Sequence, residues 1–329
     1  ARKLVAYLKA IRSEKEIVDG IVAPQGEPPK DLSAEELQVL RERFEEAVDV
    51  LGRSKRGRGK ANLYELPWYV IIGPPGSGKT TALRNSGLHF PLAERLGDEA
   101  IQGVGGTRNC DWWFTDQAVL IDTAGRYVTQ DSHADIDSAA WSGFLDLLKK
   151  YRKRRPINGV FVSISLADLI TQDEAERQRH VHAIRSRIEE IDTHFGIRFP
   201  VYVLLTKCDL VAGFTEFFEN LGREDREQVW GTTFALADRS SERSPVETFP
   251  AEFDALVKRL NERMIWRLSQ ERDVSRRAMI YRFPKQMASL KDTLTGFLSE
   301  VFSASRYSQA PMVRGVYFTS GTQEGVPID

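Results

Sequence analysis

The residues with the clearest chemical use lie at positions 73–80, Gly-Pro-Pro-Gly-Ser-Gly-Lys-Thr, which match the consensus of a phosphate-binding loop. An apolar run at Trp68–Ile72 predicts a buried strand before the loop, and a helix is predicted after it at residues 80–86. Glycines let successive backbone N–H groups turn toward phosphate oxygens, and the helix N-terminus adds the positive end of its dipole. We expect phosphate contacts from Gly73, Pro74, Pro75, Gly76, Ser77, Gly78, Lys79, Thr80 and Thr81.

Side chains at and beyond the end of this loop predict that the phosphates are those of a nucleoside triphosphate held with Mg²⁺. Lys79 can bridge the β- and γ-phosphates during catalysis, and the Thr80 hydroxyl can bind the metal ion. Asp122 follows the apolar residues 118–121 and opens the sequence Asp-Thr-Ala-Gly. A carboxylate at a strand end beside the loop can hold Mg²⁺ through water. Gly125 can offer its N–H to the γ-phosphate at small steric cost.

Residues 206–209, Thr-Lys-Cys-Asp, follow another predicted strand and suggest a site for the base. The Asp209 carboxylate can accept two hydrogen bonds from guanine, where adenine presents an acceptor instead. A charged hydrogen bond of about 1.5–3 kcal/mol makes a ten- to hundredfold preference plausible. The stem of Lys207 would lie along the base. We identify no Ser-Ala-Lys element for the base, so the choice between GTP and ATP stays open.

A third loop, residues 103–109, contains three glycines and is predicted to be mobile. Thr107 in this loop can close on Mg²⁺ when the γ-phosphate is present, as in the order–disorder switch of GTPases. The alternative is a plain flexible loop without a ligand.

The order of these motifs is similar to that of Ras-like small GTPases, and finer strings resemble the IcmF/TssM family of bacterial type VI secretion. The strings are Leu-Pro-Trp-Tyr at 66–69, Gly-Gly-Thr-Arg-Asn-Cys-Asp-Trp-Trp-Phe at 105–114, Asp-Thr-Ala-Gly-Arg-Tyr at 122–127 and Phe-Thr-Ser-Gly-Thr-Gln-Glu-Gly at 318–325. The resemblance extends over nearly the whole chain.

The resemblance implies a P-loop NTPase-like domain at the cytoplasmic face of the bacterial inner membrane, within an integral membrane protein. The membrane-spanning helices would lie outside this sequence, and we expect the sequence to be a piece of a longer chain. The implied partners are a DotU/TssL-type inner-membrane protein and cytoplasmic baseplate components of the secretion system.

Arg126 departs from the small-GTPase pattern, which places a water-orienting Gln directly after Asp-Thr-Ala-Gly. An arginine cannot accept a proton from water. It can neutralise charge on the γ-phosphate instead, and Arg108 is a second candidate for that catalytic role. The alternative for each is a surface salt bridge. We therefore predict slow intrinsic hydrolysis, on the order of 10⁻⁴ s⁻¹.

Strands that alternate with helices between residues 61 and 212 predict an α/β core with a mostly parallel sheet and helices on both faces. A hairpin of residues 112–114 and 118–121 predicts one antiparallel edge. Trp112 and Trp113 alternate on this strand, so we expect one ring in the core and the other exposed.

Two further segments flank this predicted GTPase-like NTPase core of residues 61–212. Residues 1–60 read as helices and a basic linker, and residues 213–329 as a mainly helical extension that completes the core or packs on it. The extension has helices predicted at 250–272 and 285–302, and short strand candidates at 279–281 and 316–318.

The composition excludes several other classes of protein. The 46 basic and 47 acidic residues nearly cancel, so nothing in the net charge favours nucleic acid as a partner. Two cysteines, Cys110 and Cys208, are too few for a disulfide framework and lack zinc-site spacing. No apolar run is long enough to span a bilayer.

Three functions are compatible with these motifs. The first is a nucleotide-dependent switch whose loops change contacts with secretion partners. The second is an interaction scaffold in which nucleotide is structural or dispensable. The third, a metabolic phosphotransferase, is weakly supported because no site for an acceptor substrate is apparent.

Overall fold

The computed structural model describes residues 38–39, 41–42, 45, 64–90, 110–130, 134–226, 228–235, 244–304 and 309–321. Most of the predicted N-terminal helical segment, together with Thr107 and Arg108, lies outside these residues.

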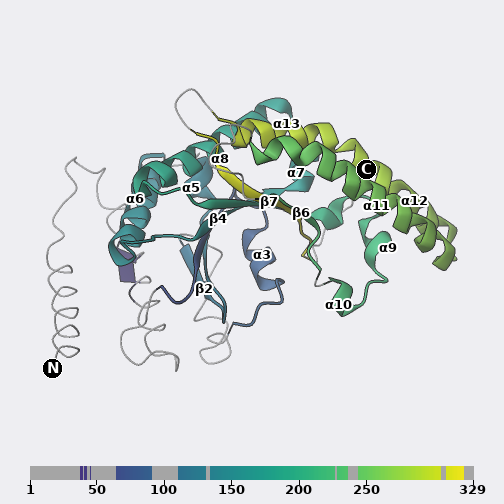
Figure 1. The fold of residues 1–329 in the computed structure, drawn as a ribbon, viewed down its shortest axis with the longest axis horizontal. Helices are drawn as coiled ribbons and strands as arrows, with labels where there is room; N and C mark the ends of the chain where they lie inside the picture. Colours follow the sequence, from purple (N-terminus) through teal and green to yellow (C-terminus); the bar gives the residue numbers. More distant parts are fainter. Residues whose placement is uncertain are drawn as a thin grey trace.

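The described strands form one mixed, mostly parallel sheet (Figure 1). Its order is β2-β3-β1-β4-β5-β7-β6, in which β1, β3, β4, β5 and β7 run parallel to one another. The strands are β1 (Trp68–Ile72), β2 (Cys110–Phe114), β3 (Val119–Thr123), β4 (Gly159–Ser165), β5 (Pro200–Thr206), β6 (Gly231–Thr233) and β7 (Met312–Phe318).

Both edges of this sheet are antiparallel. β2 and β3 form the predicted hairpin, and Trp112 is the partner of Ile121. The single antiparallel edge that we predicted is an undercount, because β6 adds a second one beside β7. β6 has only three residues and no apolar pattern, so its strand conformation depends on pairing with β7.

The helices of the described chain include short and long elements. They are α3 (Lys79–Arg84), α5 (Arg126–Thr129), α6 (Ala134–Tyr151), α7 (Leu166–Thr171), α8 (Glu174–Phe195), α9 (Phe214–Phe218), α10 (Arg223–Arg226), α11 (Phe249–Gln270), α12 (Val274–Ser289) and α13 (Lys291–Phe302), with short 3-10 turns η2 (Cys208–Leu210) and η3 (Pro245–Thr248). The local sequence sets their ends. For example, the Asp173 carboxylate accepts the Glu176 N–H at 2.8 Å where α8 begins, and Gly196 ends α8 in the left-handed conformation.

The two faces of the sheet are covered unequally in Figure 1, where α3 lies below the sheet and α5, α6, α8, α11 and α13 lie above it. The larger hydrophobic core belongs to the upper face and includes Trp68, Val70 and Ile72 of β1. A smaller cluster of Ile71, Leu83, Trp113 and Leu120 lies against α3. Alternation along each strand sends neighbouring side chains to these two cores.

The same alternation explains why the prediction for the tryptophan pair is wrong. Trp112 belongs to the larger core and Trp113 to the smaller one, so both rings are buried. Neither ring is exposed in the way that the strand alternation predicted.

The strand predicted at residues 279–281 is also wrong, because these residues lie inside α12. Ile280, Phe283 and Met287 are all buried at helical spacing, and the apolar run was one turn of that pattern. The helix predicted at 285–302 is divided at Leu290 into the end of α12 and the whole of α13. The strand predicted at 316–318 is confirmed and begins earlier, as β7.

Within the described residues, no helix is long and apolar enough to cross a membrane.

Candidate functional site

The loop of residues 73–80 connects β1 to α3, and close contacts fix its glycines. A Cβ atom on Gly73 would lie 2.3 Å from the Ser163 carbonyl oxygen of β4. Gly78 has φ of 79°, a left-handed conformation that side chains other than glycine rarely adopt. The loop therefore needs glycine at both positions to sit close to the sheet.

Two hydroxyl groups support the loop from the strands behind it. The Ser163 and Thr206 hydroxyls both donate to the Ser77 carbonyl oxygen, at 2.8 and 2.6 Å. Ser163 was not predicted from the sequence, and Thr206 was predicted only as the start of a base-binding motif. Both are polar residues near the carboxyl ends of apolar strands, a signal that could have identified them.

Lys79 is buried over this loop, and its ammonium group donates to the carbonyl oxygens of Gly73 at 2.8 Å and Pro74 at 3.1 Å. Burial lowers the pKa of Lys79 to about 8, although attraction to Asp122 partly opposes the shift. The ammonium group is thus a partly desolvated cation, which an anion would stabilise strongly.

Thr80 and Asp122 meet at the start of α3, as their predicted roles require. The Thr80 hydroxyl donates to Asp122 Oδ2 at 2.5 Å, and Asp122 is fully buried near the end of β3. β1 and β3 are adjacent parallel strands, so their carboxyl ends bring the two residues together. A hydroxyl and a carboxylate are hard oxygen ligands of the kind that Mg²⁺ prefers.

Gly125 brings the Asp-Thr-Ala-Gly segment against the loop, since a Cβ at Gly125 would lie 2.4 Å from the Pro75 nitrogen. A cavity of about 550 Å³ opens between these segments. Its lining residues are Pro75, Gly76, Ser77, Gly78, Lys79, Thr80, Thr81, Thr123, Ala124, Gly125, Arg126 and Lys207. The structure thus brings together most of the residues that the sequence proposed for phosphate.

Arg126 lines this cavity and also forms an ion pair outside it. Its Nη1 lies 2.5 Å from Oδ1 of Asp137 on α6, a carboxylate that is only 1% exposed. The guanidinium also lies 5.0 Å from the ring centre of Tyr127. Two roles were predicted for Arg126, a salt bridge or a contact with phosphate. Arg126 forms a salt bridge and also lines the cavity beside the 73–80 loop.

The predicted base-binding residues lie where β5 ends. Lys207 is left-handed, with φ of 57°, and its Nζ lies 3.8 Å from Oδ1 of Asp168 on α7. Asp209 accepts a hydrogen bond from the Ser320 hydroxyl at 2.7 Å. Lys207 lines the 550 Å³ cavity, whereas Asp209 lies beyond its lining.

Ser320 lies beside Asp209, one of the residues predicted to bind a base, and was not itself predicted from the sequence. The Cys208 N–H donates to the Thr319 carbonyl oxygen at 3.2 Å, and the Thr319 N–H donates to the Leu205 carbonyl oxygen at 2.8 Å. These bonds fix the end of β7 against residues 205–209. The polar residues Thr-Ser-Gly directly after the apolar strand at 316–318 could have indicated Ser320. In the sequence they contributed only to the resemblance to the IcmF/TssM family.

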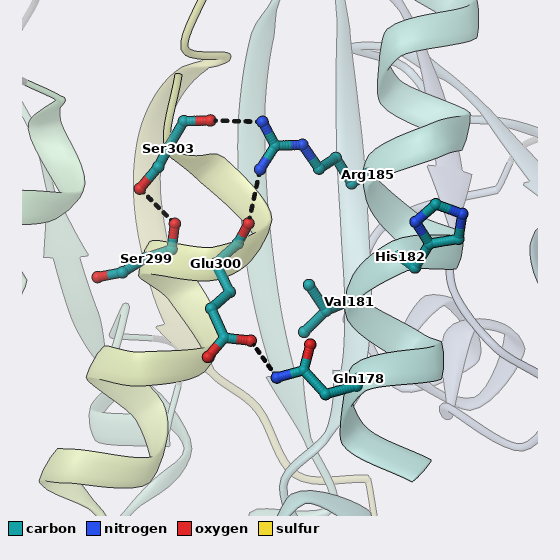
Figure 2. A pocket seen from close by; sticks show the side chains of 7 residues that line it. All are labelled: Gln178, Val181, His182, Arg185, Ser299, Glu300 and Ser303. Atoms are coloured by element: carbon teal, nitrogen blue, oxygen red, sulfur yellow. Dashed lines mark hydrogen bonds between the residues drawn. The ribbon is translucent and has the colours of Figure 1, made fainter. Parts of the chain in front are cut away.

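A second cavity, of about 490 Å³, lies between α8 and α13 (Figure 2). Arg185 donates to the carbonyl oxygens of Glu300 and Ser303, both at 3.0 Å, and Gln178 donates to the Glu300 carboxylate at 2.6 Å. These bonds tie the C-terminal end of α13 to α8. None of the predicted site residues lines this cavity. Among the described residues, no cluster of three His, Cys, Asp or Glu side chains forms a metal site.

The chain is similar to two kinds of known protein. It is 61% identical over 298 residues to the type VI secretion system component TssM1 of Pseudomonas aeruginosa, a match that covers 90% of this chain. The chain spans 27% of that protein's length.

Two solved structures are more distant. A complex of SsGBP with GDP is 16% identical, with 55% of this chain and 54% of that one covered at a TM-score of 0.27. A GTP-binding protein from Sulfolobus solfataricus in complex with GDP is 14% identical, with coverages of 55% and 52% and a TM-score of 0.25. Likeness at this level carries no argument about the site.

The model of the IcmF-related N-terminal domain matches residues 134–329, which is more than half of the chain. Together with the TssM1 match, this confirms the resemblance drawn from the motif strings, and the chain belongs to the IcmF/TssM family.

Proposed function

We propose that this chain is a P-loop NTPase-like domain that binds a nucleoside triphosphate with Mg²⁺ at the cavity beside residues 73–80. The observation that carries the proposal is the meeting of Lys79, Thr80, Asp122 and Gly125 around one glycine-rich loop. These residues come from two separate segments, and each has the chemistry that a metal–triphosphate ligand needs.

In this proposal the loop N–H groups and the Lys79 ammonium hold the phosphates. Thr80 and Asp122 hold Mg²⁺, and Thr107 completes the metal site from a loop outside the described residues. Mg²⁺ would neutralise charge on the β- and γ-phosphates. The buried Lys79 ammonium would exchange two carbonyl acceptors for anionic oxygens, which favours binding.

Asp209 and Lys207 are the proposed contacts for the base. The hydrogen bond from Ser320 restrains the Asp209 carboxylate, so it would be presented to a guanine with little loss of side-chain entropy. GTP is therefore the favoured nucleotide, and ATP is the alternative.

We propose slow hydrolysis rather than efficient turnover. Arg126 can neutralise phosphate charge but cannot orient water as a base. Its buried partner Asp137 holds the guanidinium at the cavity edge. Arg108 is the second candidate for phosphate contact. Rates on the order of 10⁻⁴ s⁻¹ are typical of GTPases without an activating partner.

The cellular context of the proposal comes from TssM1. We propose that this chain is a domain of a type VI secretion component at the cytoplasmic face of the bacterial inner membrane. Its nucleotide state would alter contacts with a DotU/TssL-type membrane protein and cytoplasmic baseplate components.

A scaffold role is the second candidate, and one observation favours it. Lys79, Ser163 and Thr206 donate to carbonyl oxygens of the loop, so the protein's own hydrogen bonds hold its shape. Nucleotide would then be dispensable, and partner binding would be unchanged by Lys79→Ala.

Titration of the chain with fluorescent GTP and ATP analogues in Mg²⁺ tests the proposal. We expect Lys79→Ala to abolish binding and Asp209→Ala to erase a preference for GTP of about tenfold. Ser320→Ala should weaken that preference less than Asp209→Ala does. Equal binding of both nucleotides would remove the guanine assignment, and a folded chain that binds neither would leave the scaffold.

A further inference from the structure

The helices α11 and α12 form a hairpin that extends past the end of the sheet, at the right of Figure 1. Their inner faces are buried in the core through residues such as Phe253, Leu260 and Ile280. Their outer faces would normally be polar. Instead, Ile265, Trp266 and Val274 are 71%, 50% and 79% exposed near the turn that joins the helices.

This end of the hairpin is also strongly basic. Residues 263–285 contain seven arginines and lysines against two acidic residues, in a chain whose overall charge is nearly zero. One of the seven, Arg267, is buried and donates to the carbonyl oxygens of Glu216 and Phe217, so the other six can contribute to the surface charge. Both acidic residues already have partners, because Glu271 pairs with the Arg276 side chain and Asp273 accepts the Arg276 backbone N–H. Arg276 also pairs with Glu219, the residue that follows α9. Arg272 and Arg277 are exposed beside Val274.

Cations lie against exposed aromatic rings on each of the two helices. The Arg263 guanidinium lies 5.7 Å from the Trp266 ring centre, and the Lys285 ammonium lies 4.3 Å from that of Tyr281. A protein partner would bury such a surface in a matching groove. A bilayer surface accepts it directly, because tryptophan favours the headgroup level and arginine pairs with lipid phosphates.

We propose that the end of the α11–α12 hairpin, around Ile265, Trp266 and Val274, docks on the surface of a bilayer that contains anionic lipids. The apolar side chains enter the headgroup region and the arginines contact anionic headgroups. No helix crosses the bilayer in this mode, and the docking is independent of the nucleotide site. Each basic residue near such a surface contributes roughly a fivefold gain in partitioning, which salt screens.

Vesicle binding by the whole chain tests this assignment. We compare vesicles of phosphatidylcholine alone with vesicles of phosphatidylcholine and phosphatidylserine. Binding should require phosphatidylserine and fall as salt rises. Tryptophan emission should shift to the blue, because Trp266 is exposed and the other five tryptophans are buried or half-buried.

Matched variants locate the contact. The double variant Ile265→Ser/Trp266→Ser should weaken vesicle binding about tenfold and remove the emission shift. Arg272→Gln/Arg277→Gln should weaken it about 25-fold, or about fivefold for each charge removed. The control variant Lys153→Gln/Arg155→Gln removes two exposed charges that follow α6 and lie outside the α11–α12 hairpin. It should leave vesicle binding unchanged. Absence of binding, equal binding to both vesicles, or equal effects of the two charge variants would overturn the proposal, whatever the nucleotide titration gives.

Discussion

At the scale of single residues, the hydrogen bond between Thr80 of α3 and Asp122 of β3 joins the two predicted metal ligands. Thr80→Val keeps the shape of the side chain and removes the donor to a fully buried carboxylate. We expect this change to lower the free energy of unfolding by about 1.5–3 kcal/mol. Thr80→Ser keeps the hydroxyl and should cost much less. Urea unfolding in the presence of a metal chelator measures both, and equal losses in the two variants would contradict the role of the hydroxyl.

Arg126 and Asp137 form the second contact with a measurable energy. Arg126→Gln leaves the buried Asp137 carboxylate without its cationic partner, while the partial exposure of Arg126 reduces the cost. We expect a loss of about 2 kcal/mol, and a smaller loss when Asp137→Asn is added. A double-mutant cycle of unfolding free energies gives the coupling. Additive losses would mean that the two side chains have no net coupling energy and would contradict the predicted role of the pair.

The proximity of Lys79, Thr80 and Asp122 could be predicted from the sequence, because a local loop and one strand end set their spacing, while their roles toward a nucleotide stay predictions. Ser163 and Ser320 were missed for the opposite reason. Each acts on a residue far away in the chain, and only the register of β4 and β7 brings them to the loop and to Asp209. Thr107 and Arg108 stay predictions.

At the scale of elements, the close approach of the Asp-Thr-Ala-Gly segment to the 73–80 loop depends on Gly125. Its φ of −60° suits any residue, so only space opposes a side chain there. Gly125→Ala would place a methyl group 2.4 Å from the Pro75 nitrogen and should force the two segments apart. We expect a loss of about 1–3 kcal/mol in stability, as for overpacked sites, together with weaker nucleotide binding.

Gly296 in α13 offers the matched substitution, because a Cβ there would meet nothing within 4 Å. Gly296→Ala should raise the free energy of unfolding by about 0.5–1 kcal/mol, since alanine favours the helix. Thermal and urea unfolding compare the two variants. A stabilising Gly125→Ala would show that the segments do not need to touch.

Elements were predictable where the apolar pattern was strong and local. The run Trp-Tyr-Val-Ile-Ile gave β1 with its observed bounds, since a buried central strand needs continuous apolar residues. One predicted strand is wrong and one observed strand was not predicted, each for a physical reason. The run at 279–281 is one turn of a helix that also contains Pro284, a residue that argues against a helix interior. The three-residue β6 has no pattern of its own and forms because β7 lies beside it.

At the scale of the whole molecule, the segment after residue 212 contributes to the sheet itself. β7 lies inside the strand order, where it pairs with β5 on one side and β6 on the other. Val313, Val316 and Phe318 of β7 belong to the same core as Trp68 of β1. The helices α11 and α13 pack into this core as well. The predicted GTPase-like core of residues 61–212 therefore lacks part of its own interior.

We therefore predict that the described sheet and helices unfold as one cooperative unit. A fragment of residues 61–212 should not unfold cooperatively, because β5 would lose a neighbour and the core would lose several large apolar side chains. A chain that ends at residue 304 removes β7 and should fail in the same way. A chain that ends at residue 321 retains β7 and should behave as the whole chain does. Calorimetry of the four proteins tests this prediction. A sharp transition in the 61–212 fragment, or two separate transitions in the whole chain, would contradict it. Either result would mean that the strands before residue 212 form a domain without β7.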